Sequence, residues 1–405
     1  MKNVLYLSYD GMTDPLGQSQ VLPYLIGLSK KGFQFTLISF EKPDRYSQEK
    51  TKIEALCIEN NIHWKPLIYT KNPPVLSTIL DIRKMKKNAF ALHREKHFQL
   101  VHCRSYISAL VGLKLKKEKG VKFLFDMRGF WADERVEGGI WNIKNPLFKF
   151  IYNYFKKKER GYFEESDAIV SLTEVGKAEI LSWSLNAVTP EKIQVIPCCV
   201  DLKLFDPKKT DFDLIHKKKT EYQLNDKYIV GYVGSIGTWY QLTEMLLAFK
   251  HILQLKPHAV FLFVTKESPS TIQSEAEKLG ITTDSIRVVA AQHHKVPCFI
   301  SLFDCSIFFI RPSFSKKASS PTKQGEIMAM GIPLICNAGV GDTDEIVLRY
   351  NSGLVLKDTR EETLSSFSLD FSDFDRERAM LGAKEYFGLE GGVESYFTIY
   401  NKFVG

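Results

Sequence analysis

Residues 318–335, ASSPTKQGEIMAMGIPLI, join a small and polar run to a helical stretch and a buried strand. Pro321 suits the first turn of a helix, because it has no N–H group to leave unpaired. Lys323 adds a positive charge there, and Glu326, about one turn later, can accept hydrogen bonds from two hydroxyls of a ribose. The pattern predicts a phosphate and ribose site. A capped surface helix with an unrelated lysine and glutamate is the alternative.

The phosphate contacts are expected at the start of this helix. Ser319 or Ser320 can cap it. The N–H groups of Thr322, Lys323 and Gln324 are then expected to point out of the helix toward an anion.

A second candidate phosphate contact is YVGSIGTWYQLTEM, residues 232–245. Gly234 and Gly237 follow an expected strand and open an expected helix, where glycine lets the backbone approach a phosphate closely. Ser235 and Thr238 could hydrogen-bond the same ligand. A plain strand-to-helix turn is the alternative, but the two candidate elements occur in one expected domain, which favours the phosphate interpretation.

The N-terminal half has a long loop after its first expected strand, SYDGMTDPLGQSQVLPYL, residues 8–25. Gly11 and Gly17 precede a helix, and Gln18 at the helix start could reach an anion. An ordinary strand-to-helix loop is the alternative.

Charged residues crowd the segment FDMRGFWADERVEGGIW, residues 125–141, directly after another expected strand. Asp126 and Arg128 make this segment a candidate catalytic surface, and Arg104, which follows a neighbouring strand, could join it. If a reaction here needs a general base for a hydroxyl, Asp14 and Asp126 are the candidates. A structural ion-pair network is the alternative.

Short β-rich runs alternate with longer amphipathic stretches, which predicts parallel sheets covered by helices on both faces. The expected strands of the first half are residues 4–9, 35–40, 100–104, 123–127, 168–172 and 193–197, with helices at 18–30, 75–96, 106–118, 145–165 and 174–184. The second half has expected strands at 228–234, 259–264, 285–290, 305–310 and 332–336, with helices at 241–255, 270–279 and 296–302. Ligands bind beyond the carboxyl ends of such strands, so two facing domains would form a cleft suited to two substrates.

The composition is that of an ordinary globular protein, with 44% hydrophobic and 25% charged residues. No apolar run approaches the roughly 20 residues of a membrane-spanning helix. The seven cysteines are scattered without metal-binding spacing, and the N-terminus reads as a strand rather than a signal peptide. We therefore expect a cytoplasmic protein, with no metal site and no nucleic-acid partner. The adjacent His293 and His294 are expected to form a polar turn.

The net charge of +8 is concentrated in residues 1–205, and part of it lies in two basic amphipathic stretches, residues 83–97 and 148–160. A solvated helix face is the default interpretation of such a stretch. Peripheral contact with the anionic inner face of the cell membrane is the alternative.

Together these segments resemble the GT-B glycosyltransferases, specifically family 4 of the group 1 type. VIPCCVDLKLF (195–205) resembles that family's VIPNGVDxxxF segment, which leads into the second domain, and residues 318–335 resemble its E-x7-E helix. The resemblance implies an α/β protein of two doubly wound Rossmann-like domains. It also implies that Glu326 binds the donor ribose, and that residues from Ser320 to Lys323 bind the donor phosphates.

The sequence departs from the family pattern in two places. The first glutamate of E-x7-E falls on Ala318, and the arginine and lysine near the glycine turn appear as Ser235 and Tyr240. Because charge-assisted hydrogen bonds are the strong ones, a diphosphate would lose much of its binding. Either Lys323 compensates, with Arg311 as a second candidate, or the donor carries one phosphate, as a CMP-activated acidic sugar does.

The resemblance implies an acceptor-binding domain over residues 1–200, on which a last helix at about 393–405 packs, and a donor-binding domain over 206–392. The expected activity is transfer of a sugar from an NDP-hexose, or from a CMP-activated acidic sugar, to a saccharide, glycan or lipid-linked acceptor. The expected context is the synthesis of bacterial surface polysaccharide, lipopolysaccharide or glycoprotein glycans. No cofactor is expected besides the nucleotide-sugar co-substrate. A sugar-nucleotide epimerase of the same fold and a non-catalytic nucleotide-sugar-binding subunit are the alternatives.

Overall fold

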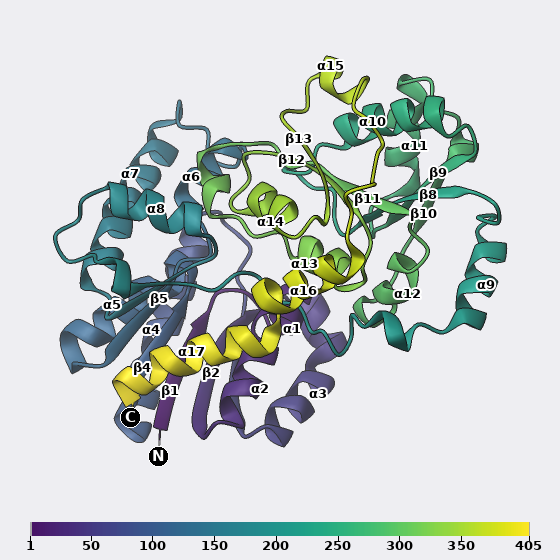
Figure 1. Ribbon diagram of the computed structural model, residues 1–405. Helices are drawn as coiled ribbons and strands as arrows, with labels where there is room; N and C mark the ends of the chain where they lie inside the picture. Colours follow the sequence, from purple (N-terminus) through teal and green to yellow (C-terminus); the bar gives the residue numbers. More distant parts are fainter. Residues whose placement is uncertain (1, 405) are drawn as a thin grey trace. The chain divides into compact units, whose positions relative to one another are not determined.

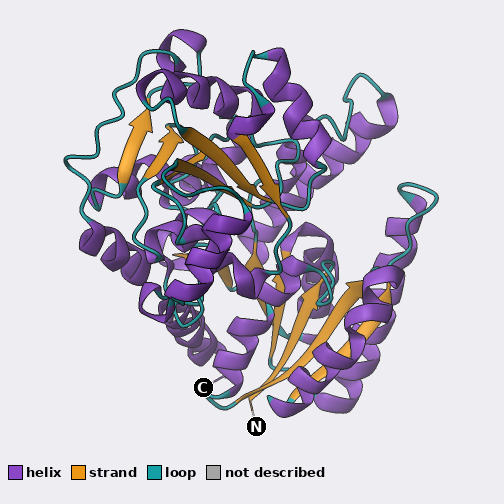
Figure 2. Cartoon of the chain, turned by 90° about the vertical axis from the view of Figure 1, so that its right-hand side faces the viewer, coloured by secondary structure: helices purple, strands orange, loops and turns teal. Residues whose placement is uncertain are grey.

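The computed structural model describes residues 2–404. The chain divides into two compact units: unit 1, which is Met1–Cys198 with Leu389–Gly405, and unit 2, which is Cys199–Gly388. Each unit is built on a parallel sheet, drawn in orange in Figure 2, with helices around it. The predicted α/β fold with two doubly wound, Rossmann-like sheets is confirmed.

The sheet of unit 1 has seven strands in the order β3-β2-β1-β4-β5-β6-β7. They are β1 (Lys2–Ser8), β2 (Phe33–Glu41), β3 (Ile62–Ile68), β4 (Leu100–Arg104), β5 (Lys122–Asp126), β6 (Ala168–Ser171) and β7 (Ile193–Val195). The helices are α1 (Pro15–Gln20), α2 (Leu22–Ser29), α3 (Pro43–Glu59), α4 (Leu76–Lys96), α5 (Ser105–Lys119), α6 (Trp131–Glu137), α7 (Pro146–Glu165), α8 (Glu174–Ser182) and α17 (Leu389–Val404).

The central strands of unit 1 are apolar because both faces of the sheet are covered. Every residue of β4 is buried, and in β2 only Gln34 is exposed. The strand order reverses between β1 and β4, and the carboxyl ends of strands at such a switch point are where sheets of this kind bind ligands. The loop after β1 and the residues after β4 and β5 therefore occupy the expected functional edge.

Helix α17 belongs to unit 1 although it follows unit 2 in the sequence. It packs against α2 and contacts β4, as the yellow helix in Figure 1 shows. Tyr396 and Tyr400 of this helix are buried, so the end of the chain contributes to the core of unit 1.

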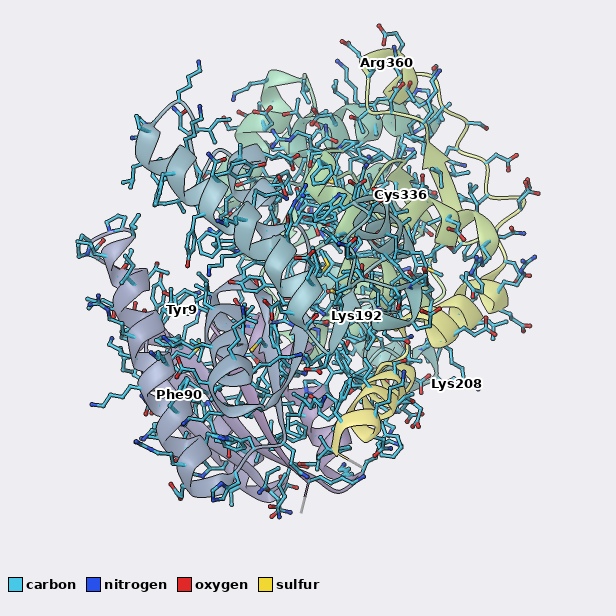
Figure 3. All side chains as sticks on the ribbon, turned by 90° about the vertical axis from the view of Figure 1, so that its left-hand side faces the viewer. Tyr9, Phe90, Lys192, Lys208, Cys336 and Arg360 are labelled. Carbon is cyan, nitrogen blue, oxygen red and sulfur yellow. The ribbon has the colours of Figure 1, made fainter. Side chains whose placement is uncertain are left out.

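Helix α4 is tied to the end of β1. The hydroxyl of Tyr9 donates a hydrogen bond to Asp81 of α4 over 3.2 Å. Figure 3 labels Tyr9 and also Phe90, which marks α4.

The sheet of unit 2 has six strands in the order β10-β9-β8-β11-β12-β13. They are β8 (Tyr228–Val233), β9 (Ala259–Val264), β10 (Ile286–Val289), β11 (Cys305–Phe308), β12 (Leu334–Asn337) and β13 (Gly353–Leu356). The helices are α9 (Phe212–Glu221), α10 (Leu242–Leu255), α11 (Pro269–Lys278), α12 (Val296–Ile300), α13 (Thr322–Ala329), α14 (Thr343–Arg349), α15 (Glu361–Leu364) and α16 (Arg376–Phe387). Here the order reverses between β8 and β11, so the turn after β8 lies at the expected ligand edge.

Some elements were missed by the sequence prediction. Strand β3 buries only its first residue and α3 buries only two, so neither shows the strong apolar pattern on which the prediction depends. The single helix expected over residues 18–30 is two helices, because Val21 leaves helical geometry at φ −130°.

Candidate donor and acceptor sites

The turn after β8 is built on glycines with positive φ. Gly234 has a φ of +102° and Gly237 a φ of +52°. A side chain is strained at the first of these angles, so the backbone there depends on glycine. The hydroxyl of Tyr232 donates to the carbonyl oxygen of Ser235 over 2.7 Å and closes the turn. The side chains of Ser235 and Thr238 are exposed.

Helix α13 brings Lys323 to this turn. A β-carbon added to Gly234 would lie 3.5 Å from the Lys323 Nζ. The same Nζ lies 3.5 Å from the ring centre of Tyr240 and 3.9 Å from that of Tyr232. The two candidate phosphate elements predicted from the sequence therefore meet at one point in unit 2.

The Lys323 side chain is buried, with 7% of the residue exposed. Its Nζ has no hydrogen-bond partner among the residues that the structure describes. Burial lowers the pKa of this amine well below its usual value because the charged form loses its hydration, and the nearby Glu326 carboxylate offsets this only in part. The structure thus holds a buried amine whose charged form is disfavoured and which has no hydrogen-bonded acceptor among the described residues.

The start of α13 differs from the prediction. Pro321 is the N-cap residue, and no side chain caps the helix, so the expected cap by Ser319 or Ser320 is wrong. The N–H of Gln324 donates to the carbonyl oxygen of Pro321 over 3.0 Å, and it is therefore not available to a ligand as expected. Thr322 and Lys323 keep the amides that could face an anion.

Glu326, the predicted ribose ligand, is held by His293. One carboxylate oxygen lies 3.1 Å from the Nε2 of His293. The hydrogen bond to Glu326 raises the pKa of His293, although burial works against it. The His293 ring also lies 5.5 Å from that of Phe205. The sequence predicted only a polar turn at His293 and His294, and it gave no sign of this contact, because His293 and Glu326 are 33 positions apart.

The segment after the glycine turn is tied to the end of β11. The N–H of Arg311 donates to the carbonyl oxygen of Trp239 over 3.0 Å, and Tyr240 forms an isolated bridge with Ile310. The Nζ of Lys316 lies 3.7 Å from the Trp239 ring centre, and the Arg311 guanidinium lies 5.1 Å from it. Cations therefore flank this segment, although the family's own arginine and lysine positions are uncharged.

In unit 1, the glycine loop after β1 is organised by Glu41, which no residue pattern had singled out. This carboxylate is fully buried at the end of β2. It accepts hydrogen bonds from the N–H of Met12 (2.9 Å), the N–H of Thr13 (3.0 Å) and the hydroxyl of Thr13 (2.6 Å). Because the buried Glu41 carboxylate accepts hydrogen bonds from two backbone N–H groups of the loop, it fixes the shape of the loop.

Close contacts require glycine at Gly11, which faces the end of β2, and at Gly17, which meets the loop's own backbone. A β-carbon on Gly11 would lie 2.8 Å from a Glu41 oxygen, and one on Gly17 would lie 2.2 Å from the carbonyl oxygen of Gly11. The Gln18 amide donates to the carbonyl oxygen of Thr13 over 3.3 Å, so this side chain also contacts its own loop.

Asp14, a predicted base, is engaged by two cations. Its carboxylate lies 2.9 Å from the Nζ of Lys42 and 3.2 Å from the Nε of Arg45. Only 11% of the Asp14 side chain is exposed, against 55% and 44% for the two partners. The Asp14 carboxylate is therefore buried beneath two exposed basic side chains.

Asp126, predicted as part of a candidate acceptor or catalytic surface, lies inside unit 1. The residue is 1% exposed. Its carboxylate accepts a hydrogen bond from the Tyr396 hydroxyl (3.1 Å) and lies 3.4 Å from the Nε2 of His102. Burial would raise the pKa of Asp126, but Arg128, His102 and Arg104 outweigh it and hold the pKa below its usual value.

The two predicted arginines join the same network. Arg104 donates from Nε to Asp10 over 3.2 Å, and Arg128 donates from Nη2 to the sulfur of Cys198 over 3.2 Å. Arg128 has a φ of +56°, which is rare for a side chain of this size. Asp126, Arg104 and Arg128 are thus brought together as predicted, and they match the ion-pair alternative in being almost wholly buried.

Two doubly wound sheets, one carrying a glycine turn and an uncapped helix start, define the GT-B class of fold. Comparison with known families agrees. Residues 21–204 match the Glycosyltransferase Family 4 model, and residues 215–384 match the Glycosyl transferases group 1 model. The chain belongs to this glycosyltransferase family.

A curated relative is the D-inositol 3-phosphate glycosyltransferase of Segniliparus rotundus, 26% identical over 206 residues. The match covers 49% of this chain and 43% of that protein, so the chain aligns with less than half of the relative's length. Sucrose-phosphate synthase from Thermosynechococcus elongatus shares the fold with a TM-score of 0.73 at 16% identity, with 99% of each chain covered. A UDP-GlcNAc 2-epimerase from Neisseria meningitidis, solved with UDP-GlcNAc bound, has a TM-score of 0.58 at 11% identity, again with 99% of each chain covered.

Proposed function

We propose that this enzyme transfers a sugar from a nucleotide-activated donor, bound by unit 2, to a saccharide, glycan or lipid-linked acceptor, bound by unit 1. The proposed context is the synthesis of bacterial surface polysaccharide, lipopolysaccharide or glycoprotein glycans. Membership of the family supports the reaction class. The donor, the acceptor and the context are parts of the proposal.

The observation that supports the donor site most strongly is the meeting of Lys323 with the Gly234 turn. Glu326 lies one turn further along α13, already oriented by His293. A phosphate at the turn would receive the ammonium and the amides of the helix start, and a ribose would receive the carboxylate.

In the proposed reaction, the bond between the anomeric carbon and the phosphate oxygen breaks and the oxygen of the acceptor hydroxyl forms the new bond to that carbon, while the hydroxyl proton passes to the departing phosphate or to a base. Negative charge grows on the departing phosphate, where Lys323 and the helix amides stabilise it. If the transfer inverts the anomeric carbon, the acceptor hydroxyl needs a base. Asp14 is then the better of the two predicted candidates, since Asp126 is enclosed by its partners.

A thermal-shift screen tests the donor proposal, because a ligand that binds the native state raises the melting temperature. UDP, GDP, ADP, CDP and CMP are compared with their nucleosides. We expect the nucleotides of one base to raise the melting temperature more than the others do. The comparison of CDP with CMP shows whether one phosphate is enough for binding. No stabilisation by any nucleotide would refute the donor site.

Incubation with the donor alone and with donor plus acceptor separates the alternatives. Transfer only in the presence of an acceptor supports the glycosyltransferase, whereas an isomerised sugar nucleotide without acceptor identifies an epimerase. Nucleotide binding with no reaction against any acceptor would favour a non-catalytic subunit. The name of the curated relative includes a phosphorylated inositol, so small phosphorylated acceptors belong in the acceptor panel.

We also propose that unit 1 contacts an anionic membrane surface through the start of α7. Exposed apolar side chains gather there: Ile143, Leu147, Phe150 and Tyr154. Exposed Lys149 and Lys157 lie on the same helix, and apolar groups beside lysines suit an anionic interface. No helix within residues 2–404 is both long and apolar enough to span a bilayer.

Cosedimentation with phosphatidylglycerol vesicles tests this contact. Phe150, 69% exposed, is replaced by serine, and Phe212, 75% exposed in unit 2, serves as the matched control. We expect Phe150→Ser to reduce vesicle binding several-fold and Phe212→Ser to leave it unchanged. Equal effects of the two variants, or no vesicle binding by the native protein at low salt, would contradict the proposal.

A further inference from the structure

The amine of Lys323 lies against two aromatic ring faces and not against a hydrogen-bond acceptor oxygen. We call Tyr232 and Tyr240 the tyrosine cage, since their ring centres lie 3.9 Å and 3.5 Å from the Nζ. The hydroxyl of Tyr232 is already used by the carbonyl oxygen of Ser235. A ring face attracts a cation but accepts no normal hydrogen bond, so the N–H groups of the Lys323 amine have no acceptor in the tyrosine cage.

The charged and titratable groups that face Lys323 are few. The tyrosine cage comes from β8 and from the segment before α10, and burial raises the pKa of Tyr232, which keeps that phenol neutral. Glu326 comes from α13 itself and acts on Lys323 electrostatically, while His293 takes one of its oxygens. None of these groups gives the amine a hydrogen-bonded counter-ion.

The geometry also explains the departure of this chain from its family. The position at which the family carries a lysine is Tyr240, and the ring of Tyr240 lies against the Lys323 amine, which comes from α13 instead. One cation has thus been relocated from the glycine turn to the facing helix, within reach of the same phosphate position beside Gly234.

We propose that Lys323 binds the donor phosphate from the tyrosine cage and takes up a proton from solvent as the phosphate enters. This inference rests on the proposed donor site. The amine gains one proton and the phosphate supplies the missing acceptor, while no covalent bond of the nucleotide changes. Donor binding is therefore linked to proton uptake, and the protonated Lys323 amine lies beside the leaving phosphate.

The physical basis is the balance between hydration and charge pairing. Without ligand, burial favours the neutral amine. A phosphate dianion in contact with the amine reverses this preference, because an opposite charge within a few ångströms favours the charged form and raises the pKa of the amine. Arginine at this position would stay charged throughout.

Isothermal titration calorimetry measures the linkage. UDP, GDP, CDP and CMP, with their nucleosides, are titrated in two buffers of different ionisation enthalpy at about pH 8, where the nucleotide phosphate (second pKa about 6) is already ionised. For the nucleotide that binds, we expect uptake of up to about one proton by the native protein and none with the nucleoside.

Two variants complete the test. Lys323→Met should weaken nucleotide binding by tenfold or more and abolish proton uptake, whereas Lys323→Arg should keep binding without uptake. Lys266→Met, at an exposed lysine of unit 2, is the matched control. Nucleotide binding that survives Lys323→Met with unchanged proton uptake overturns the inference and leaves the donor site standing. Failure of every nucleotide to bind the native protein overturns the donor site as well.

Discussion

Replacing Lys323 by methionine should make the nucleotide-free protein more stable. The substitution keeps a long side chain against the tyrosine cage and removes an amine that has no hydrogen-bond partner in the described structure. An unsatisfied buried donor costs about 1–3 kcal/mol, so the free energy of unfolding should rise by about this amount. For a unit of this size, at roughly 3 °C per kcal/mol, the melting temperature should rise by about 3–9 °C.

The sign of the pH dependence follows from the lowered pKa of Lys323. The unfolded chain holds a proton that the folded protein lacks, so acid favours unfolding and the stability of the native protein rises with pH toward the usual pKa of lysine, about 10.4. The advantage of Lys323→Met should therefore be largest near neutral pH and shrink as the pH rises to about 10.

Thermal unfolding of the native protein, Lys323→Met and the control Lys266→Met between about pH 6 and pH 10 provides the measurement. The reasoning fails if Lys323→Met melts at a lower temperature than the native protein at neutral pH. A stabilisation that does not change with pH would also contradict it, since the gain would then come from packing and not from the titrating amine.

Three other substitutions test the remaining geometry. His293→Asn should raise the donor KM more than it lowers kcat, since Glu326 loses the contact that orients it. Because the folded-state pKa of His293 is raised, the stability that the His293–Glu326 contact contributes is full below about pH 6.5 and is lost as the pH rises through the raised pKa. Melting temperatures measured across this pH range check the second expectation. Gly17→Ala should destabilise unit 1 by about 1–3 kcal/mol because its β-carbon meets backbone at 2.2 Å, whereas Gly161→Ala, with open space in a helix, should stabilise by up to about 1 kcal/mol in the same denaturation assay. Tyr396→Phe should cost about 1–3 kcal/mol in urea unfolding, because its hydroxyl donates to a buried carboxylate.

The donor-site elements could be predicted because their signals are local. Gly234 and Gly237 follow an apolar strand within a few residues, and Lys323 and Glu326 lie on one helix turn. Their surroundings could not be predicted in the same way. Tyr232 comes from a strand about 90 positions before Lys323, and the burial that makes the lysine a weak base exists only once β8 and α13 pack together.

In unit 1 the sequence predicted which charges would gather but not whether they would be exposed. Arg104 and Asp126 are the last residues of the neighbouring strands β4 and β5, so parallel pairing places them side by side. The side chain that encloses Asp126 comes from Tyr396, 270 positions later. Glu41 was missed for a related reason: a single glutamate at the end of a strand has no local pattern, and its role depends on Met12 and Thr13, which lie 29 and 28 positions earlier.

The relocation of one cation changes how a phosphate would be recognised. A permanently charged arginine at the glycine turn attracts any anion, whereas burial disfavours the charged form of the amine in the tyrosine cage, and an anion close to Gly234 would favour that form again. Part of the interaction free energy is then used for protonation, so nucleotide affinity should fall by up to about tenfold per pH unit as the pH rises above the free-state pKa of Lys323. A donor with two phosphates brings more charge to offset that cost than a donor with one. The fall in affinity begins at the free-state pKa of Lys323 for both nucleotides and ends at the pKa of the bound amine, so it should continue to a higher pH for CDP than for CMP if both phosphates reach the amine, and to the same pH if only one does.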